Sequence, residues 1–496
     1  MGAVQKAISG WLSVVETTTY SVVGHFDVVE KFPWHDYLFF HFFFSLLNGI
    51  MAYFFKRRKI MEKFFKLKEN GTTVSKEIVA GITTFLAMAY ILAVNPGMLS
   101  AVGNGMTFPA VFTATAISSA IATLVMALWA NLPVALAPGM GLNAFFTFTV
   151  CLGMGCSWQL ALTAVLIEGI IFIVLSIFGI REKIINAIPA GMKKAVAVGI
   201  GLFIALIGLA NAGIVSGDTG TIIGFVNFDM KHTTALVAMI GLIITIVLYL
   251  LKVPGAILIA ILATTIIGIP FGVTTVPEGW VPFSLPASPL LFKFDFAGIL
   301  SIKFVVIVFT FLFTDLFDTV GTLMGVTQQA GLVDEKGNIP SAKAALMSDS
   351  IGTVVGACLG TSTVTSYVES SSGVAAGGRT GLTSVTTGVL FLLALFMTPI
   401  FALIPGAATA PALIFVGFLM LQQVVDIDWK DPTEGIPAFI TILVMPCAYS
   451  IAKGIAFGMI AYVIAKVAGK KTKDIPVATW VLAVIFIADI IFEALK

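Results

Sequence analysis

The chain has 496 residues, of which 58% are hydrophobic and 11% are charged. Soluble domains carry roughly 25% charged residues, so this composition excludes an ordinary soluble domain and predicts an all-α polytopic membrane protein. The net charge is +2 and the basic residues are scattered or sit in short clusters, which excludes a nucleic-acid-binding protein.

Cysteine and histidine usage gives no sign of a metal centre. The four cysteines form no CxxC pair, and the four histidines show no ligand spacing. The HExxH and Gly-x-Ser-x-Gly patterns of hydrolases are missing from the sequence as well. We therefore expect no metal, no cofactor and no enzyme activity.

Residues 1–73 are predicted to form an N-terminal extension. The phenylalanine-rich run 38–55 fits either a short span or an interfacial helix. Met61 opens a sequence that would itself serve as an N-terminus, so residues 1–60 are either dispensable or an upstream start. Seven basic residues between positions 56 and 68 predict that the first span of the main body starts on the cytoplasmic side.

Apolar stretches long enough for a hydrocarbon core of about 30 Å follow in chain order. They are 76–100, 108–130, 157–179, 191–213, 232–251, 254–273, 296–324, 343–361, 381–402, 406–424, 434–450, 452–468 and 476–494, the last of which either spans the membrane or lies at its interface. Two shorter glycine-rich stretches, 134–150 and 362–378, are predicted to be discontinuous elements that each contain a short strand.

The two discontinuous stretches hold corresponding places in two halves of the chain. The halves are residues 74–273 and 296–468, joined by a loop at 274–295 and followed by a basic loop and a hydrophobic helix at 469–496. Seven elements in each half, an odd number, make the second half enter the membrane from the opposite side. This pattern predicts 14 transmembrane segments in a 7+7 inverted repeat, which is typical of secondary transporters.

Three acids stand out in this apolar background. Asp315 and Asp318 lie three residues apart in the span 296–324, and Glu369 lies in the second discontinuous stretch. A carboxylate at bilayer depth costs roughly 2.5 to 3.5 kcal/mol, so such residues usually line a polar cavity or a transport path. Carboxylates accept hydrogen bonds from the N–H groups of a planar heterocycle, and two close like charges favour uptake of a proton.

The residues around these acids allow more than one role. Thr319 adds a hydroxyl to the acidic helix face, and Asp318 either binds the ligand or supports backbone amides. In the first discontinuous stretch, Asn143 either binds the ligand or caps the helix, and Gly141 either shapes the site or serves packing. Glu168, alone in its span, is either a core hydrogen-bonding group or part of a proton relay.

Four sequence strings resemble the nucleobase-cation symporters of the xanthine and uracil permease superfamily, and most closely its AzgA-like branch. They are APGMGLNAFF, FTDLFDTVGTLMGV, STVTSYVESSSGVAAGGRTGLTSVTTG and DPTEGIPAFITILVMPCAYSIAKGIAFG. The resemblance runs from about Val74 to the end of the chain. It implies a core domain that holds the substrate and a gate domain against which the core moves.

On the matching positions, the resemblance implies that Asp315 and Glu369 hold the substrate, with Val368 beside them. Asn143 and Gly141 would shape the site, and Asp318 would support it.

The implied function is import of adenine, guanine or hypoxanthine across the cell membrane by proton symport, with sodium as the alternative coupling ion. A uracil or xanthine permease, and an anion transporter of the same fold, are the alternatives. We expect the lipid bilayer as surroundings, no nucleic-acid partner, and either a monomer or a homodimer.

Overall fold

The computed structural model describes residues 58–178, 189–216, 224–226, 232–333, 339, 341–476 and single positions between 479 and 487. The chain divides into two units, Met1–Ile60 and Met61–Lys496. The predicted run 38–55 lies outside the described residues, and so does most of 476–494. The fold is therefore that of the second unit, after the short helix α3 (Arg58–Phe64).

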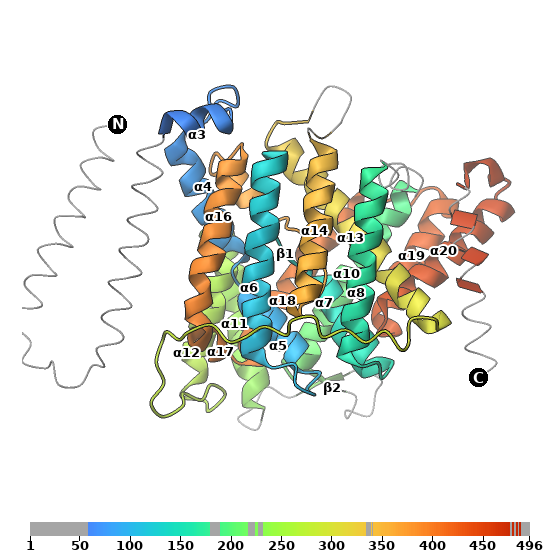
Figure 1. Cartoon of the computed structure of the whole chain (residues 1–496). Helices are drawn as coiled ribbons and strands as arrows, with labels where there is room; N and C mark the ends of the chain where they lie inside the picture. Colours follow the sequence, from blue (N-terminus) through green and yellow to red (C-terminus); the bar gives the residue numbers. More distant parts are fainter. Residues whose placement is uncertain are drawn as a thin grey trace, which may run out of the picture. The chain divides into compact units, whose positions relative to one another are not determined.

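The described residues form a bundle of apolar helices (Figure 1). Within the part of the chain that the structure describes, ten helices are long and apolar enough to cross a membrane, which confirms a multi-pass, all-helical membrane protein. The long helices are α4 (Val74–Met88) with α5 (Ile91–Ser100), α6 (Phe108–Val125) with η1 (Met126–Ala130), α8 (Trp158–Ile177), α10 (Ala190–Asn211), α11 (Thr233–Leu250), α13 (Ile302–Gln329), α14 (Ala342–Leu359), α16 (Gly381–Ala394) with η4 (Leu395–Met397) and α17 (Thr398–Ala402), α18 (Gly406–Leu421) with η5 (Gln422–Asp426), and α20 (Ile451–Ala468). Shorter apolar helices are α7 (Met140–Ala144) with η2 (Phe145–Gly153), α12 (Ala256–Gly268) and α19 (Pro432–Cys447).

Two predicted spans differ from the structure at their ends or centre. The stretch 76–100 is not one smooth helix, because α4 ends at Met88 and α5 starts at Ile91. The helix predicted to begin at residue 296 begins instead at Ile302, the first residue of α13. The hydroxyl of Ser301 accepts a hydrogen bond from the backbone N–H of Phe304 and so caps this helix start. Such an N-cap satisfies one of the free N–H groups of a helix start.

Both discontinuous stretches contain a short strand, as the sequence predicted. Strand β1 (Leu136–Pro138) pairs antiparallel with β4 (Val364–Ser366), with Ala137 opposite Thr365. Two further backbone hydrogen bonds continue the pairing, from the N–H of Gly139 to the carbonyl of Thr363 and from the N–H of Tyr367 to that of Ala135. The pairing satisfies backbone groups that would otherwise be stranded in an apolar interior.

Each strand runs into a short helix, β1 into α7 and β4 into α15 (Ser370–Ala375). The strands are antiparallel, so the two short helices leave the pair in opposite directions. The breaks in two segments separated by more than 200 residues therefore meet at one place in the bundle.

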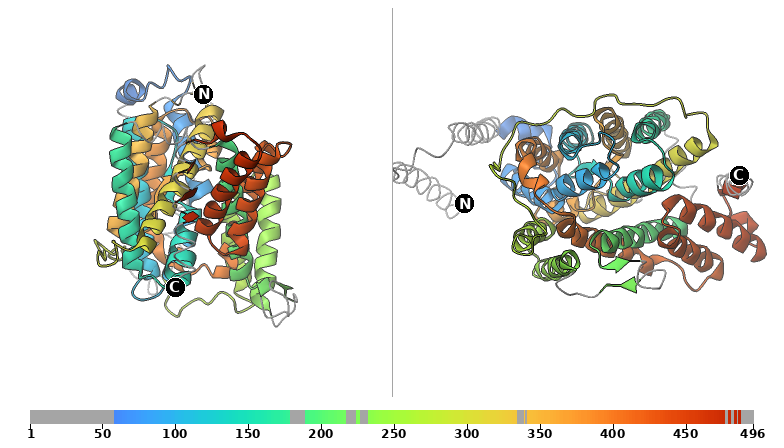
Figure 2. Two further views of the ribbon diagram at one scale, coloured as in Figure 1. Left: turned by 90° about the vertical axis from the view of Figure 1, so that its right-hand side faces the viewer. Right: turned by 90° about the horizontal axis from the view of Figure 1, so that it is seen from below.

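The helices form two sets, which lie side by side in Figure 2. In the first set, α6, α13 and α14 contact the strand pair, α8 and α16 pack on these helices, and α4 packs on α16. The second set contains α10, α11, α12, α18, α19 and α20, which pack mainly on one another. In the second set, α10 and α18 approach closely at two glycines. A Cβ atom on Gly417 would lie 2.5 Å from the carbonyl oxygen of Gly201, so a side chain does not fit there.

Charged side chains join α19 to α20 and to the segment after it. The buried Lys466 lies with its Nζ 2.6 Å from Oε1 of Glu434. Asp431 precedes α19 and accepts a hydrogen bond from Lys471, which holds the pKa of this carboxyl well below its usual range. These contacts fasten the last helices of the second set to each other.

Between α12 and α13 the described residues 269–301 contain no helix or strand, and the segment runs along one end of the bundle (Figure 1). It is attached to three elements of the first set. The N–H groups of Ser284, Phe292 and Asp295 donate to Phe396 O, Cys358 O and Thr163 Oγ1. A second small sheet, β2 (Val215–Ser216) with β3 (Gly224–Phe225), lies between α10 and α11.

Candidate functional site

Helix α13 presents its two acids in different surroundings. Asp315 is fully buried, whereas Asp318 is partly exposed. Three residues along an α-helix turn a side chain by about 300°, which leaves the two carboxyl groups on one broad face but about 60° apart. This rotation turns Asp315 toward the protein interior and Asp318 toward accessible space.

Thr319 lies at the centre of the polar interior behind Asp318. Its Oγ1 lies 3.1 Å from Oδ1 of Asp315, 2.7 Å from Oδ1 of Asp349 on α14 and 2.7 Å from Oγ1 of Thr365 on β4. Thr319 is fully buried. Because a hydroxyl group has one hydrogen to donate, it can donate to only one of the two carboxyl groups at a time.

Glu369, which lies in the second discontinuous stretch, directly precedes the short helix α15. Its carboxylate is partly exposed, and the neighbouring side chain of Val368 is 50% exposed. The hydroxyl of Tyr90, which lies between α4 and α5, donates to Oε1 of Glu369 over 2.5 Å. The carboxyl group of Asp318 lies near enough for the two charges to interact. Two carboxyl groups from α13 and α15 thus come together with a buried phenol.

The backbone at the start of α7 borders the same place. A Cβ atom on Gly139 would lie 2.6 Å from Cγ2 of Thr365 and 3.6 Å from Oδ2 of Asp318. Only glycine leaves room for that approach, so the carboxylate of Asp318 can lie against the break in the first discontinuous stretch. Tyr367 closes the other side, and its hydroxyl donates to the carbonyl oxygen of Pro138.

Asn143 and Gly141 are both buried. The contacts of these two residues are with other groups than the carboxyl groups of Asp318 and Glu369. The amide of Asn143 donates to the carbonyl oxygen of Pro138 over 3.3 Å, and its oxygen accepts from Ser362. It therefore ties the two broken stretches together. A Cβ atom on Gly141 would lie 2.7 Å from Cγ2 of Ile200 on α10, so this glycine allows the first set of helices to approach the second.

Glu168 supports the second break from α8. Its side chain is fully buried, and Oε2 accepts a hydrogen bond of 2.6 Å from the hydroxyl of Thr363, just before β4. The contact provides a partner that no sequence pattern supplied. The binding or relay roles of this acid and of the other site residues stay predictions.

Helix α15 is held against α4 along its whole length. A Cβ atom on Gly373 would lie 2.0 Å from Oγ1 of Thr84 and 2.6 Å from the carbonyl oxygen of Ala80. At the far end, Arg379 donates to the carbonyl oxygens of Val374 and Gly378. This end of the segment is anchored by Glu77 of α4, whose buried carboxylate accepts hydrogen bonds from the backbone N–H of Arg379 and from the hydroxyl groups of Thr380 and Thr383.

Sequence reasoning did not identify Tyr90, Asp349 or Glu77 as part of this region. Tyr90 carried a usable signal, because the hydroxyl of a tyrosine in an apolar span usually needs a hydrogen-bond partner. Glu77 lies near the start of a span, where an acid is unremarkable. The described residues contain no group of three metal-ligating side chains.

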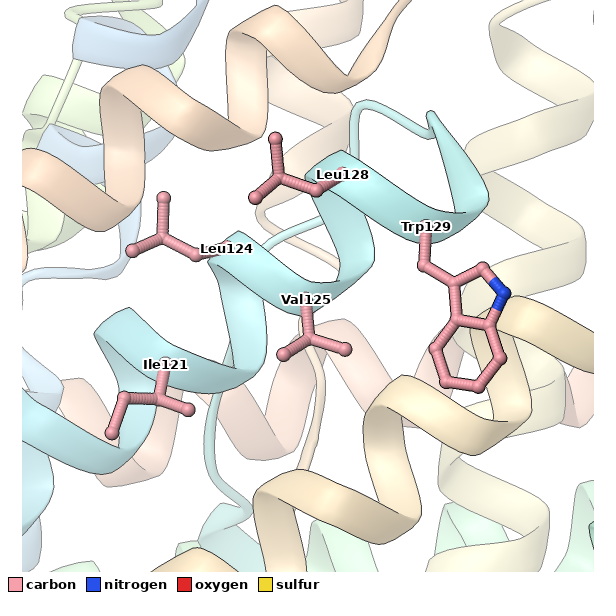
Figure 3. A pocket seen from close by; sticks show the side chains of 5 residues that line it. All are labelled: Ile121, Leu124, Val125, Leu128 and Trp129. Atoms are coloured by element: carbon pink, nitrogen blue, oxygen red, sulfur yellow. The ribbon is translucent and has the colours of Figure 1, made fainter.

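An apolar groove of about 400 Å³ lies elsewhere, on the outside of α6 and η1 (Figure 3). Its lining consists of Ile121, Leu124, Val125, Leu128 and Trp129. Trp129 is 56% exposed near the end of the span, a typical place for tryptophan at the membrane–water interface. The lining is apolar apart from the indole N–H of Trp129, so the groove suits a lipid chain better than a polar ligand.

The fold matches solved structures of membrane transporters. The transmembrane domain of a cyanobacterium bicarbonate transporter, BicA, superposes with a TM-score of 0.58 at 16% identity over 78% of this chain and 97% of that chain. The murine anion transporter Slc26a9 in its inward-facing state gives a TM-score of 0.55 at 12% identity, over 80% and 68% of the two chains. These similarities show a shared fold, and in this chain the helical bundle contains two broken helices that pair through β1 and β4.

Sequence comparison assigns the family. Residues 75–457 match the permease family Xan_ur_permease. The chain is 46% identical to the guanine/hypoxanthine permease PbuG of Bacillus subtilis over 87% of this chain and all of that protein, and 42% identical to the adenine permease AdeP of Escherichia coli over 87% and 96%. A putative permease of Methanocaldococcus jannaschii is 50% identical over 86% of this chain. The chain belongs to this permease family, which confirms the resemblance and the class of transporter rather than enzyme.

Proposed function

We propose that this protein imports purine nucleobases, namely adenine, guanine or hypoxanthine, by proton symport with alternating access. The observation that carries the proposal is the pair of partly exposed carboxyl groups, Asp318 and Glu369, at the meeting point of two broken helices. The adenine permease and the guanine/hypoxanthine permease among the relatives supply the substrate class. The uncharged edge of a purine offers N–H donors to both acids.

The fold supports fourteen transmembrane segments in a 7+7 inverted repeat. Ten long helices, three shorter apolar helices and the broken segment β4–α15 make fourteen. The repeats would be 74–273 and 296–468, joined by 274–295, with the N-terminal end of α4 cytoplasmic, as the basic residues before it indicate. The first set of helices would be the core domain, and the second set the gate domain.

We assign the ligand role on α13 to Asp318 rather than to Asp315. The sequence favoured Asp315 by family resemblance, but its carboxyl group is fully buried among Thr319 and its neighbours, whereas that of Asp318 is partly exposed beside Gly139. A carboxylate that contacts the base must be accessible to it. Asp315 then acts from behind, together with Thr319 and Asp349.

Hydrogen-bond counting around Thr319 supports proton coupling. One hydroxyl hydrogen cannot serve both Asp315 and Asp349, so all the contacts of Thr319 are hydrogen bonds only when one of these carboxyl groups is itself a donor. A proton on either acid completes the network. The buried pair therefore offers a place for the coupled proton that is separate from Asp318 and Glu369.

The test is uptake of labelled hypoxanthine, guanine and adenine into proteoliposomes, with the proton and sodium gradients set independently. We expect saturable accumulation driven by the proton gradient. Asp318→Ala and Glu369→Ala should each abolish it, whereas Glu278→Ala, at an exposed acid of the connecting segment, should leave it unchanged. Normal uptake by both site variants would refute the site, and accumulation driven by sodium alone would refute proton coupling.

Three other substrates, uracil, xanthine and bicarbonate, follow from the family and the fold. Uracil and xanthine are distinguished from adenine, guanine and hypoxanthine by competition with labelled hypoxanthine in the same vesicles. The anion-transporter relatives of the fold raise bicarbonate as an alternative. Against it, residues 362–378 contain no cationic side chain, and Glu369 would repel an anion at the second break.

A further inference from the structure

We propose that Tyr90 is a positioning residue of the substrate site, whose hydroxyl group fixes the orientation in which Glu369 meets the nucleobase. The inference rests on the proposed function, because it assigns to Tyr90 a part in the binding of that substrate. It adds the first transmembrane segment, α4–α5, to a site otherwise built from β1–α7, α13 and β4–α15.

The contact itself is short and sheltered. Tyr90 is fully buried, and its hydroxyl lies 2.5 Å from Oε1 of Glu369, 279 residues away in the chain. A hydrogen bond from a neutral donor to a carboxylate is stronger than one between neutral groups, and shelter from water strengthens it further. The phenol therefore holds one carboxylate oxygen, Oε1, and the carboxyl group also accepts a hydrogen bond from the backbone of Glu369 itself.

The backbones on both sides of this contact are fixed independently of it. Tyr90 lies at the break between α4 and α5, so the two helices fix the position of its backbone. The backbone of α15 is held on α4 at Gly373, where a Cβ atom would collide with Thr84 and Ala80. The fold thus sets the backbone position of Glu369. The Tyr90 hydroxyl group restricts the torsion angles of the Glu369 side chain.

The surroundings of Glu369 explain why a fixed orientation matters. Its side chain is partly exposed and follows the exposed Val368, so part of its surface contacts no neighbouring side chain. Asp318 is the charged group that interacts with it from α13, and a turned carboxylate would approach that acid or water instead of the base. Tyr367 is close as well, but its hydroxyl donates to Pro138.

The experiment compares Tyr90→Phe with wild type in proteoliposomes that contain equal amounts of folded protein, as judged by melting temperature and by reconstituted mass. Tyr462→Phe is the matched control, because it removes the same atom from a buried tyrosine next to a carboxylate, Glu434, in the gate domain. We measure KM and Vmax for hypoxanthine, and inhibition by hypoxanthine derivatives methylated at single ring nitrogens.

For Tyr90→Phe we expect KM to rise about tenfold or more, with Vmax changed less than twofold, because a hydrogen bond to a charged group is lost. Discrimination against the methylated derivatives should weaken, since a loosely held carboxylate selects poorly for an N–H donor. Tyr462→Phe should match wild type in both measurements.

A purely structural role for Tyr90 would lower Vmax or the melting temperature and leave KM and discrimination at wild-type values, and that result would overturn the inference. Wild-type vesicles that accumulate none of the three purines would instead overturn the proposed function, and the inference with it. The wild-type arm and the variant arm thus report the two failures separately.

Discussion

At the scale of single residues, the polar interior around Thr319 contains more oxygen atoms than hydroxyl hydrogens that can be donated to them. The hydroxyl of Thr319 lies within hydrogen-bonding distance of Asp315, Asp349 and Thr365, which come from three different elements. Each of these oxygens is buried, so losing the hydroxyl would leave polar groups without water as a substitute. Thr319 therefore connects α13, α14 and β4 in one network.

Thr319→Val removes this hydroxyl with little change of shape. We expect the free energy of unfolding in detergent micelles to fall by about 2 kcal/mol, because a buried partner left unsatisfied costs about 1–3 kcal/mol. Thr319→Ser keeps the hydroxyl and should lose less than half as much. Equal free energies of unfolding of the valine and serine variants, measured by denaturant unfolding, would show that the hydroxyl group does not stabilise the fold.

The three acids could be singled out from the sequence because a charge in an apolar span is costly wherever it points. Their division of labour could not. Asp315 and Asp318 differ by about 60° around one helix, and only the packing of distant elements such as α8, β4 and α15 against α13 decides which of them is buried. Contacts such as Tyr90 with Glu369, or Thr363 with Glu168, join positions roughly 200 or more residues apart and leave no local pattern.

At the scale of elements, the two breaks were predictable because glycine and proline interrupt apolar stretches at 134–150 and 362–378. Their mutual pairing was not predicted, since the register of Ala137 opposite Thr365 depends on how two distant segments meet. The half-helix α15 shows a further tertiary dependence. With six residues it is too short to be stable alone, so contacts with α4 must hold it.

Gly373→Ala tests that support. The added methyl would lie 2.0 Å from Oγ1 of Thr84 and 2.6 Å from the carbonyl oxygen of Ala80, which is backbone and cannot turn away. We expect α15 to shift and the Kd for the nucleobase to rise roughly tenfold or more, because binding groups must be held within about 0.5 Å. Binding is measured directly by titration of purified protein with hypoxanthine.

Gly325→Ala is the control for this substitution. Gly325 lies within α13, and a Cβ atom there would meet nothing within 4 Å. Alanine has a higher helix propensity than glycine, so this variant should be no less stable than wild type. It should also bind hypoxanthine as wild type does, because the added methyl group displaces nothing. If Gly373→Ala binds equally well, the close approach of α15 to α4 is not what positions Glu369.

At the scale of the whole molecule, the two sets of helices meet where Gly141 on α7 approaches Ile200 on α10. The sequence indicated a division into two halves along the chain, whereas the division in space draws helices from both halves into each set. Chain order alone does not show this interleaving, because it depends on how helices far apart in the sequence pack in space. The alternating access proposed above requires the two sets to move relative to each other at such contacts.

A crosslink between positions 141 and 200 should therefore stop transport while leaving the fold intact. A Cβ atom on Gly141 would lie 2.7 Å from Cγ2 of Ile200. Adding one bond of about 1.5 Å puts the two Cβ atoms at most roughly 4.2 Å apart, within the reach of a disulfide. Gly141→Cys with Ile200→Cys is placed in a protein whose native cysteines Cys151, Cys156, Cys358 and Cys447 are replaced by serine or alanine.

We expect oxidation of this variant to reduce hypoxanthine uptake by more than about tenfold, and reduction with dithiothreitol to restore it, because a disulfide prevents the sliding of α7 on α10. Each single-cysteine variant controls for the loss of glycine or isoleucine and should not respond to oxidation. Uptake in vesicles is compared with the crosslinked fraction of the same sample, measured as a mass change of two hydrogens. Full transport by fully crosslinked protein would mean that the core and gate do not separate at this contact during the cycle.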